Sequence, residues 1–367
     1  MSKIYVLHCI HGMGSGGAEK DIINWSNKLK EKEIYFDFLI RSNDIFYEKE
    51  IEKNGGKIFY TAAFPSHIFR NVWETYKFFK KNYMHYQAVH VHGNTAFYIW
   101  PLILAKRFNI PVRIFHIHST HAANRISNVF HKINSKLLPL IVTENIACSK
   151  KAAKFGNMKK ALIVKNMVDD KQFYPINDQN LIKQIKKKYN TAKFEKIFVH
   201  IGRFLEVKNH SFLLEIFKKI LEKEPSSCLI LVGVGPLMNK IKHLSDEMGI
   251  SKNIRFLGEI SNVNEILNIS NVMIFPSIYE GIPLTLLEAQ LSETRVIASD
   301  SIDKESKITP YLQFMSLNKS AKKWAEKTLK LANESIEFDS RIELKKKNYT
   351  IDSEVEKLAK LYKGGTK

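Results

Sequence analysis

Two carboxylates, Glu280 and Glu288, flank a turn that leads from a strand into a helix. The run Val272–Phe275 is short and apolar and is followed by a proline, which is typical of a buried parallel strand. Pro283 stands where the first turn of a helix accepts proline, and Leu284–Leu291 has the composition of that helix. The sequence therefore predicts a strand, a turn and a helix, with one carboxylate before the helix and one inside it.

A turn of this kind suits a sugar phosphate. The first N–H groups of a helix have no partner within the helix, and its dipole is positive there, so a phosphate is favoured. Glu280 and Glu288 could hold sugar hydroxyls on either side of that phosphate. Arg203 and Lys208 follow a strand that we predict at 197–201. Two cations at a strand-to-helix turn suit a diphosphate leaving group.

These motifs resemble those of the retaining glycosyltransferases of family 4. Glu280 and Glu288 have the spacing Glu-x7-Glu, and Glu-Gly-Ile-Pro followed by Glu-Ala-Gln is similar to the polysaccharide-building branch of that family. Residues 202–209 fit the pattern Gly-Arg-x4-Lys-Asn. The resemblance covers most of the chain and implies the GT-B fold. In that fold, which is α/β, two Rossmann-like, doubly wound domains face a central cleft, and a C-terminal helix crosses back to the N-terminal domain.

The resemblance also implies roles for single residues. Glu280 would hold the hydroxyls of the donor sugar, Glu288 the ribose, and His118 would face the sugar or the acceptor. The residues expected to bind the donor are Gly16, Gly17, Arg203, Lys208, Ile260, Glu280, Pro283, Leu284, Thr285 and Glu288. The residues expected to act in catalysis are Glu280, His118, Lys208 and Arg203.

The implied reaction moves a sugar from a nucleotide-sugar, with UDP favoured, to a lipid-linked or oligosaccharide acceptor during synthesis of capsule, O-antigen or exopolysaccharide. The acceptor attacks the face from which the diphosphate leaves, so the anomeric configuration is retained. Cations and a helix dipole take the place of a metal ion, and Asp-x-Asp does not occur in the sequence. We therefore expect no cofactor and no metal. Residues 291–295 depart from the family pattern Ala-x-Gly-x-Pro, and we expect this to alter packing only.

A glycine loop near the start of the chain leaves other functions open. Gly12, Gly14 and Gly17 have the spacing of a dinucleotide-binding fingerprint, and Asp37 follows where an acidic residue would bind a ribose. The alternative is thus an NAD-dependent oxidoreductase, although Asp37 lies inside a predicted strand (35–40) and not at its end. A sugar-nucleotide epimerase or hydrolase of the same fold and a non-catalytic polyanion-binding protein are further alternatives.

Three histidines lie close together where a strand predicted at 112–118 ends, namely His116, His118 and His121. A metal site would need ligands in a fixed geometry and, usually, a supporting carboxylate, and none is evident nearby in the sequence. We interpret these residues as core or loop histidines, apart from His118, which matches the His-x-His element of the family.

The length of 367 residues predicts two domains. We expect an N-terminal acceptor-side domain at 1–170, a C-terminal domain that binds the nucleotide-sugar at 171–345, and a helix at 346–367 that packs on the first domain. No apolar run approaches the roughly 18 residues of a transmembrane helix, and the first residues are too polar for a signal peptide. The three isolated cysteines fit a reducing compartment, so we expect a cytoplasmic protein.

Positive charge is concentrated in one part of the chain. The formal net charge is +20, and residues 66–165 hold sixteen Lys and Arg against two Glu. Such a patch suits a polyanion or an anionic membrane, and no nucleic-acid-binding motif accompanies it. The helix predicted at 68–82 carries aromatic residues beside basic ones, which suits either a core face or a membrane-surface helix. A second basic, amphipathic segment follows at 122–138. We expect peripheral association with the inner face of the plasma membrane.

Overall fold

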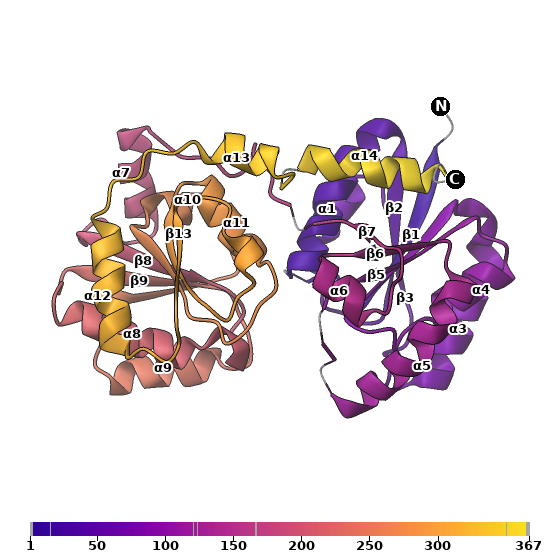
Figure 1. Cartoon of the computed structure of the whole chain (residues 1–367), viewed down its shortest axis with the longest axis horizontal. Helices are drawn as coiled ribbons and strands as arrows, with labels where there is room; N and C mark the ends of the chain where they lie inside the picture. Colours follow the sequence, from indigo (N-terminus) through magenta and orange to yellow (C-terminus); the bar gives the residue numbers. More distant parts are fainter. Residues whose placement is uncertain are drawn as a thin grey trace. The chain divides into compact units, whose positions relative to one another are not determined.

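The structure is a computed structural model that describes residues 3–364, except for residues 15, 120, 123, 166 and 350 and for the side chain of Ser353. The chain divides into two compact units: unit 1 consists of Met1–Met167 and Ile351–Lys367, and unit 2 of Val168–Thr350. Each unit is built around one parallel sheet with helices on both faces (Figure 1). The α/β, Rossmann-like fold class predicted from the sequence is thereby confirmed for each unit.

Unit 1 contains a seven-stranded sheet in the order β3-β2-β1-β4-β5-β6-β7. All neighbouring strands are parallel. Their apolar side chains alternate between two cores because successive residues of a strand face opposite sides of the sheet. The strands are β1 Ile4–Ile10, β2 Ile34–Ile40, β3 Ile58–Tyr60, β4 Ala88–Gly93, β5 Val112–Ile117, β6 Glu144–Ala147 and β7 Leu162–Ile163.

The helices of unit 1 cover both faces of its sheet. One core is closed by α1 Gly17–Leu29, α2 Glu48–Lys53 and α14 Ile351–Tyr362. The other is closed by α3 Ile68–Asn82, α4 Trp100–Arg107, α5 Arg125–Ile141 and α6 Lys150–Phe155. Two short 3-10 turns, η1 Lys30–Lys32 and η2 Tyr83–His85, follow α1 and α3.

The C-terminal helix α14 packs on unit 1, as predicted. It lies beside α1 (Figure 1) and buries Leu358 and Tyr362 completely in the same core. Lys28 of α1 pairs with Asp352 at 3.3 Å, and Lys32 pairs with Glu356 at 2.6 Å. Exposed ion pairs of this kind add little stability, so the apolar face of α14 holds it in place.

Unit 2 contains a six-stranded parallel sheet in the order β10-β9-β8-β11-β12-β13. The strands are β8 Lys196–Ile201, β9 Ser227–Val232, β10 Ile254–Gly258, β11 Val272–Phe275, β12 Arg295–Ser299 and β13 Leu312–Met315. One face is covered by α7 Gln179–Lys188, α10 Val263–Ile269, α11 Leu284–Leu291 and α13 Ser340–Lys346, and the other by α8 His210–Leu221, α9 Met238–Glu247 and α12 Ala321–Ala332. The 3-10 turns are η3 Glu206–Lys208, η4 Ser251–Asn253 and η5 Lys304–Ser306.

Each sheet reverses its strand order once. In unit 1 the reversal lies between β1 and β4, and in unit 2 between β8 and β11. At such a point the loops after the two strands leave in opposite directions and open a crevice at the carboxyl ends of the strands, which is where open α/β sheets bind ligands. The crevices therefore lie beside the loops that follow β1 and β4 in unit 1 and β8 and β11 in unit 2.

Helix α5 contains a proline close to its C-terminal end. Helix α5 continues through Pro139 to Ile141, and β6 begins only at Glu144. A proline inside a helix costs about 3 kcal/mol. Leu138 and Ile141 are both buried in the core beside it, and burial of such side chains contributes about 1.5–3 kcal/mol each. Core packing thus outweighs the local preference of proline.

Helix α3 leaves most of its aromatic residues outside the core. Phe79 is fully buried, whereas Phe69 is 93% exposed and Trp73 and Tyr76 are about half-exposed. Of the two interpretations of this helix, the core face therefore applies to Phe79 and, in part, to Phe78, which packs against the same core. Among the described residues, no helix is both long enough and apolar enough to span a bilayer.

Candidate active site

Lys208 and Glu280 meet at the reversal point of the sheet in unit 2. Lys208 ends η3 in the loop after β8, and Glu280 lies in the loop after β11. The ammonium nitrogen of Lys208 lies 2.6 Å from Oε1 of Glu280, and both side chains are mostly buried. Lys208 also sits 4.7 Å above the ring of Phe275, the last residue of β11. The structure thus brings together two of the residues that were predicted to act in catalysis.

The two loops are held to each other by backbone contacts. The N–H of Ile278 donates to the carbonyl of Val207 at 2.8 Å, and the amide of Asn209 donates to the carbonyl of Pro276 at 3.2 Å. Gly202 makes room for the lysine, because a Cβ at this position would lie 3.0 Å from Cε of Lys208. The position of the ammonium group is therefore fixed by the fold and not only by its partner.

Helix α11 begins next to this pair. Pro283 is its N-cap residue, and no side chain caps its first N–H groups. Leu284 is buried and Thr285 is partly buried in the first turn. Glu288 lies one turn further and is 2% exposed. Unpaired N–H groups and the positive end of a helix dipole favour an anion here, as the sequence predicted.

Two predicted donor residues lie further out on the same unit. Arg203 lies two residues after the end of β8 and is exposed. Ile260 follows β10 at the edge of the sheet and packs partly against the core beneath α10 and α11. No described contact joins either residue to Lys208 or Glu280. Their roles as ligands of a diphosphate and a base stay predictions.

The glycine loop of unit 1 lies after β1. Gly16 caps α1, and its carbonyl accepts the N–H of Lys20 at 3.0 Å, while Gly17 is the first residue of that helix. A Cβ on Gly16 would meet the carboxylate of Glu19, so the flexible Glu19 side chain would have to shift to admit one. Both glycines are at least partly exposed at the carboxyl end of the sheet, where they were expected.

The structure does not favour the dinucleotide alternative. A Cβ on Gly12 would lie 2.8 Å from the carbonyl of Asp44, and one on Gly14 would lie 2.6 Å from its carboxylate, so these glycines serve the packing of two segments of unit 1. Asp37 is buried in the middle of β2. Its carboxylate accepts the N–H of Lys57 at 2.8 Å and the hydroxyl of Tyr86 at 3.0 Å, and is therefore not placed to bind a ribose.

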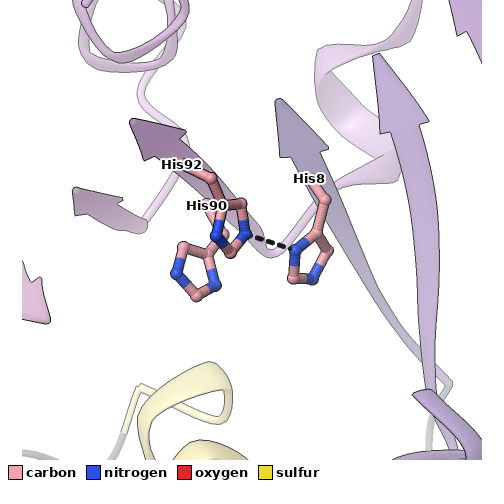
Figure 2. A group of neighbouring side chains, drawn as sticks. All are labelled: His8, His90 and His92. Atoms are coloured by element: carbon pink, nitrogen blue, oxygen red, sulfur yellow. Dashed lines mark hydrogen bonds between the residues drawn. The ribbon is translucent and has the colours of Figure 1, made fainter. Parts of the chain in front are cut away.

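His118 stands directly after β5 and leads into a group of buried histidines. Its Nε2 lies 2.9 Å from Nδ1 of His92, and Nε2 of His92 lies 2.9 Å from Nδ1 of His8 (Figure 2). His90 bonds through Nδ1 to the hydroxyl of Tyr362 at 2.8 Å. Burial lowers the pKa of His118 to about 4. His118 is thus neutral near pH 7.

The histidine group was not predicted in full. His8, His90, His92, His116 and His118 stand at alternate positions of three adjacent strands, which places their side chains on one face of the sheet. Two triplets, His8–His90–His92 and His92–His116–His118, have ring nitrogens within 4.8 Å of one another, a spacing that a metal ion could use. Alternation of histidine with apolar residues in Ala88–Gly93 was the available signal. The expected absence of a metal stays a prediction.

Comparison with known proteins gives the family. Residues 182–350 match the family described as glycosyl transferases group 1. EpsF of Bacillus subtilis (strain 168), whose name is that of a glycosyltransferase, is 32% identical over 341 residues, which are 89% of this chain and 87% of that protein. The capsular polysaccharide biosynthesis glycosyltransferase CapH of Staphylococcus aureus is 28% identical over 341 residues, 89% of this chain and 90% of its own.

A solved structure supports the fold. The crystal structure of Anabaena Alr3699/HepE in complex with UDP and glucose has a TM-score of 0.73 with this chain at 14% sequence identity, and the match covers 98% of this chain and 96% of the other. At that identity the likeness speaks for the GT-B fold alone. The family match and the relationship to EpsF across most of both chains lead to one conclusion: the chain belongs to the glycosyl transferases group 1 family and is a glycosyltransferase.

Proposed function

We propose that this protein is a retaining glycosyltransferase of family 4 that uses a UDP-sugar. The observation that carries the proposal is the Lys208–Glu280 pair at the reversal point of the sheet, next to the open N-terminus of α11. This arrangement offers a cation and N–H groups to a diphosphate and a carboxylate to the adjacent sugar. The relative CapH acts in capsular polysaccharide biosynthesis, as its name states, which supports a part in such a pathway here.

Each residue has a stated part in the proposed reaction. Lys208, Arg203 and the N–H groups of Leu284 and Thr285 stabilise the negative charge that grows on the departing diphosphate, and such electrostatic stabilisation contributes most to catalysis in many enzymes. Glu280 holds hydroxyls of the donor sugar. The acceptor hydroxyl attacks from the side of the leaving phosphate, which takes its proton, so the configuration is retained. This chemistry needs no metal ion, because the fixed cations and the helix dipole supply the charge.

The remaining residues position the ligands. Glu288 holds the ribose, Ile260 lies along the base and Pro283 shapes the turn before α11. Gly16 and Gly17 allow a ligand to approach the backbone of unit 1 without a Cβ in the way. His118 contributes hydrogen bonding rather than charge, because the pKa lowered to about 4 keeps it neutral near pH 7. The uracil preference draws on HepE, whose structure holds UDP and glucose.

A lipid-linked acceptor fits the surface of unit 1. Helices α3 and α5 cover the same face of the sheet, and both leave apolar side chains in solvent. The most exposed are Phe69, Trp73, Tyr76, Ile126, Val129, Phe130, Ile133, Leu137 and Leu140. Basic residues of both helices stand among them, a combination that binds anionic membranes. We propose that this face holds the protein on the cytoplasmic leaflet, where a lipid-linked saccharide is presented.

The first experiment is a thermal-shift panel of UDP, GDP, ADP and NAD with the purified protein. A ligand that binds only the folded state raises the melting temperature by mass action. We expect a rise with UDP, which a Lys208→Ala variant loses. A rise with NAD alone would contradict the proposal and favour the oxidoreductase. Incubation with a UDP-sugar and a saccharide acceptor then separates the remaining alternatives, since an epimerase or hydrolase changes the donor without an acceptor and a binding protein leaves it intact.

A further inference from the structure

Three histidines, His8 and His92 buried and His118 partly buried, form a hydrogen-bonded row across the sheet of unit 1. His8 comes from β1, His92 from β4, and His118 follows β5. Both links of the row are 2.9 Å long: Nδ1 of His8 meets Nε2 of His92, and Nδ1 of His92 meets Nε2 of His118. Figure 2 shows the first of these links, with His90 beside it. Each link therefore joins one ring nitrogen of one histidine to one ring nitrogen of the next.

All three rings are neutral in the folded protein. Burial lowers the pKa of His8 to about 3 and that of His118 to about 4, and it lowers the pKa of His92 well below 6.5. A neutral imidazole has one N–H donor and one acceptor nitrogen. Each 2.9 Å link needs one donor and one acceptor, so the tautomer of one ring fixes the tautomer of the next. The row therefore has only two possible arrangements of tautomers.

The surroundings of His8, at one end of the row, favour one of these two arrangements of tautomers. Nε2 of His8 is buried and has no hydrogen-bond partner among the described residues, and the ring lies 4.0 Å from the ring of Phe36. An unpaired buried N–H is rarer and less favourable than an unpaired acceptor. His8 thus carries its proton on Nδ1 and donates to His92. His92 then carries its proton on Nδ1 and donates to Nε2 of His118.

We infer that His8 and His92 are positioning residues that hold His118 in the tautomer with its proton on Nδ1. His118 stands at the carboxyl end of the sheet, where its Nε2 is already occupied by His92. The part of this inference that concerns contact between His118 and a substrate rests on the proposed function. In that reaction His118 offers an N–H donor to a substrate oxygen, and it does not act as a general base.

A metal ion is the competing use of the same side chains. The ring nitrogens of His8, His90 and His92 lie within 4.8 Å of one another. Of these, the nitrogens of His8 and His92 that face each other already share a hydrogen bond, and an ion between them would have to replace it. The row explains these contacts without an ion, so we favour it and keep the ion as an outcome of the test.

The test reads the tautomer directly. Protein labelled with 15N-histidine is examined by two-bond proton–nitrogen correlation, which tells a protonated ring nitrogen from a bare one. The signal of His118 is identified by its absence from the spectrum of His118→Gln. We expect the wild-type ring to carry its proton on Nδ1, the opposite of the Nε2–H tautomer that a solvent-exposed histidine side chain favours. This measurement needs no variant of His8, so it stands even if such variants fold poorly.

Two substitutions at one position give the matched pair. His8→Asn keeps an N–H near the place of Nδ1, whereas His8→Leu has a similar shape without a donor. We expect His118 to keep its tautomer in His8→Asn and to lose it, wholly or in part, in His8→Leu. His90→Phe is the control, because it changes a buried ring that stacks on His92 at 4.1 Å but is not part of the row. It should leave the tautomer of His118 unchanged.

Turnover supplies the second reading. With a competent UDP-sugar and acceptor, we expect kcat/KM to fall about fivefold in His8→Leu, the worth of one hydrogen bond, and to recover in His8→Asn. A wild-type His118 with its proton on Nε2, or an unchanged tautomer in His8→Leu, overturns the inference. So does a stoichiometric transition metal in the purified protein that His8→Leu loses. If UDP does not bind while the Nδ1 tautomer is found, the proposed function fails and the row stands.

Discussion

The ammonium nitrogen of Lys208 lies 2.6 Å from the carboxylate of Glu280, although the two residues follow different strands of one sheet. Each charge is mostly removed from water and is compensated by the other. A donor that enters this place brings a diphosphate, which competes for the lysine, and sugar hydroxyls, which suit the carboxylate. The pair is thus a resting arrangement that the substrate exchanges for two separate contacts.

Substitution of Lys208 and substitution of Glu280 should affect UDP binding differently, although both should lower the rate of sugar transfer. We expect Lys208→Ala to weaken UDP binding and to lower transfer at least a hundredfold, because one fixed cation contributes about 3–4 kcal/mol at such a site. Glu280→Gln should lower transfer to a similar extent but leave UDP binding unchanged or tighter, because the lysine is freed. Titration calorimetry with UDP and initial rates with a UDP-sugar measure the two effects.

The control for that pair is an ion pair of equal length on the surface. Lys219 and Glu222 also lie 2.6 Å apart, in α8 and just after it, and both are well exposed. Lys219→Ala should change neither UDP binding nor transfer, since exposed pairs contribute little. Near-native transfer by folded Lys208→Ala or Glu280→Gln would show that the chemistry lies elsewhere.

Gly202→Ala tests the space beneath Lys208. The added Cβ would lie 3.0 Å from Cε and 3.2 Å from Cδ of the lysine, so the flexible side chain must shift by a fraction of an ångström. We expect the melting temperature to change little and kcat/KM to fall about tenfold, because small displacements of a catalytic group are costly. Gly249→Ala is a comparison in the same unit, where a Cβ meets no neighbour but the backbone is left-handed. It should reduce stability and leave kcat/KM intact.

Acid should destabilise unit 1 through its histidines. Burial lowers the pKa values of His8 and His118 to about 3 and about 4, and those of His90, His92 and His116 well below 6.5. As the pH falls below 6.5, these histidines become protonated in the unfolded chain, whereas they stay neutral in the folded chain. Stability is therefore full above pH 6.5 and falls between pH 6.5 and 4, by about 1.4 kcal/mol per pH unit for each such histidine.

Thermal unfolding between pH 7.5 and 4.5 measures this loss. The slope should become shallower in His116→Phe, because the ring nitrogens of His116 have no hydrogen-bond partner among the described residues that the change would remove. His243→Gln replaces an exposed histidine and is the control that should keep the wild-type slope. A melting temperature that stays level from pH 7 to pH 5 would mean that these histidines are not buried as neutral rings.

The exposed aromatic face of α3 should bind anionic lipid. Phe69 is 93% exposed and Trp73 is 56% exposed, with Lys77 lying 3.4 Å above the Trp73 ring. We expect the double variant Phe69→Ser, Trp73→Ser to sediment poorly with vesicles that contain anionic lipid, while wild type sediments well. Ile342→Ser removes a 65% exposed apolar residue from unit 2 and should behave as wild type. Equal binding of the wild type to neutral and anionic vesicles would contradict the membrane proposal.

Local patterns predicted the elements well where they were strong. The helices Ile68–Asn82 and Leu284–Leu291 and the strand Val272–Phe275 were placed at their true bounds, because periodicity and flanking turn residues agree there. The short helix Glu48–Lys53 and the strand Leu312–Met315 were not predicted. The helix Glu48–Lys53 has few apolar residues. The strand Leu312–Met315 is fixed by its pairing with β12, and its own sequence does not reveal that pairing.

The candidate site was predictable to the extent that it follows strand ends. Lys208 and Glu280 were named because their motifs resemble those of a known family and follow two predicted strands, and parallel strands bring such loops together. Their direct contact depends on the strand order, which places β11 beside β8. His8 and His92 were missed for a similar reason. They belong to strands separated by two others in sequence, and only the sheet makes them neighbours.

The packing of α14 has a consequence for biosynthesis. Unit 1 needs residues from both sides of unit 2 in the sequence, because Leu358 and Tyr362 close the core that faces the buried histidines. A ribosome makes the chain from its N-terminus, and domains fold as they emerge. Unit 2 can therefore fold completely while the core of unit 1 that α14 later covers is still exposed to solvent. A chaperone that shields apolar surface should be needed longest by the part of the protein that is made first.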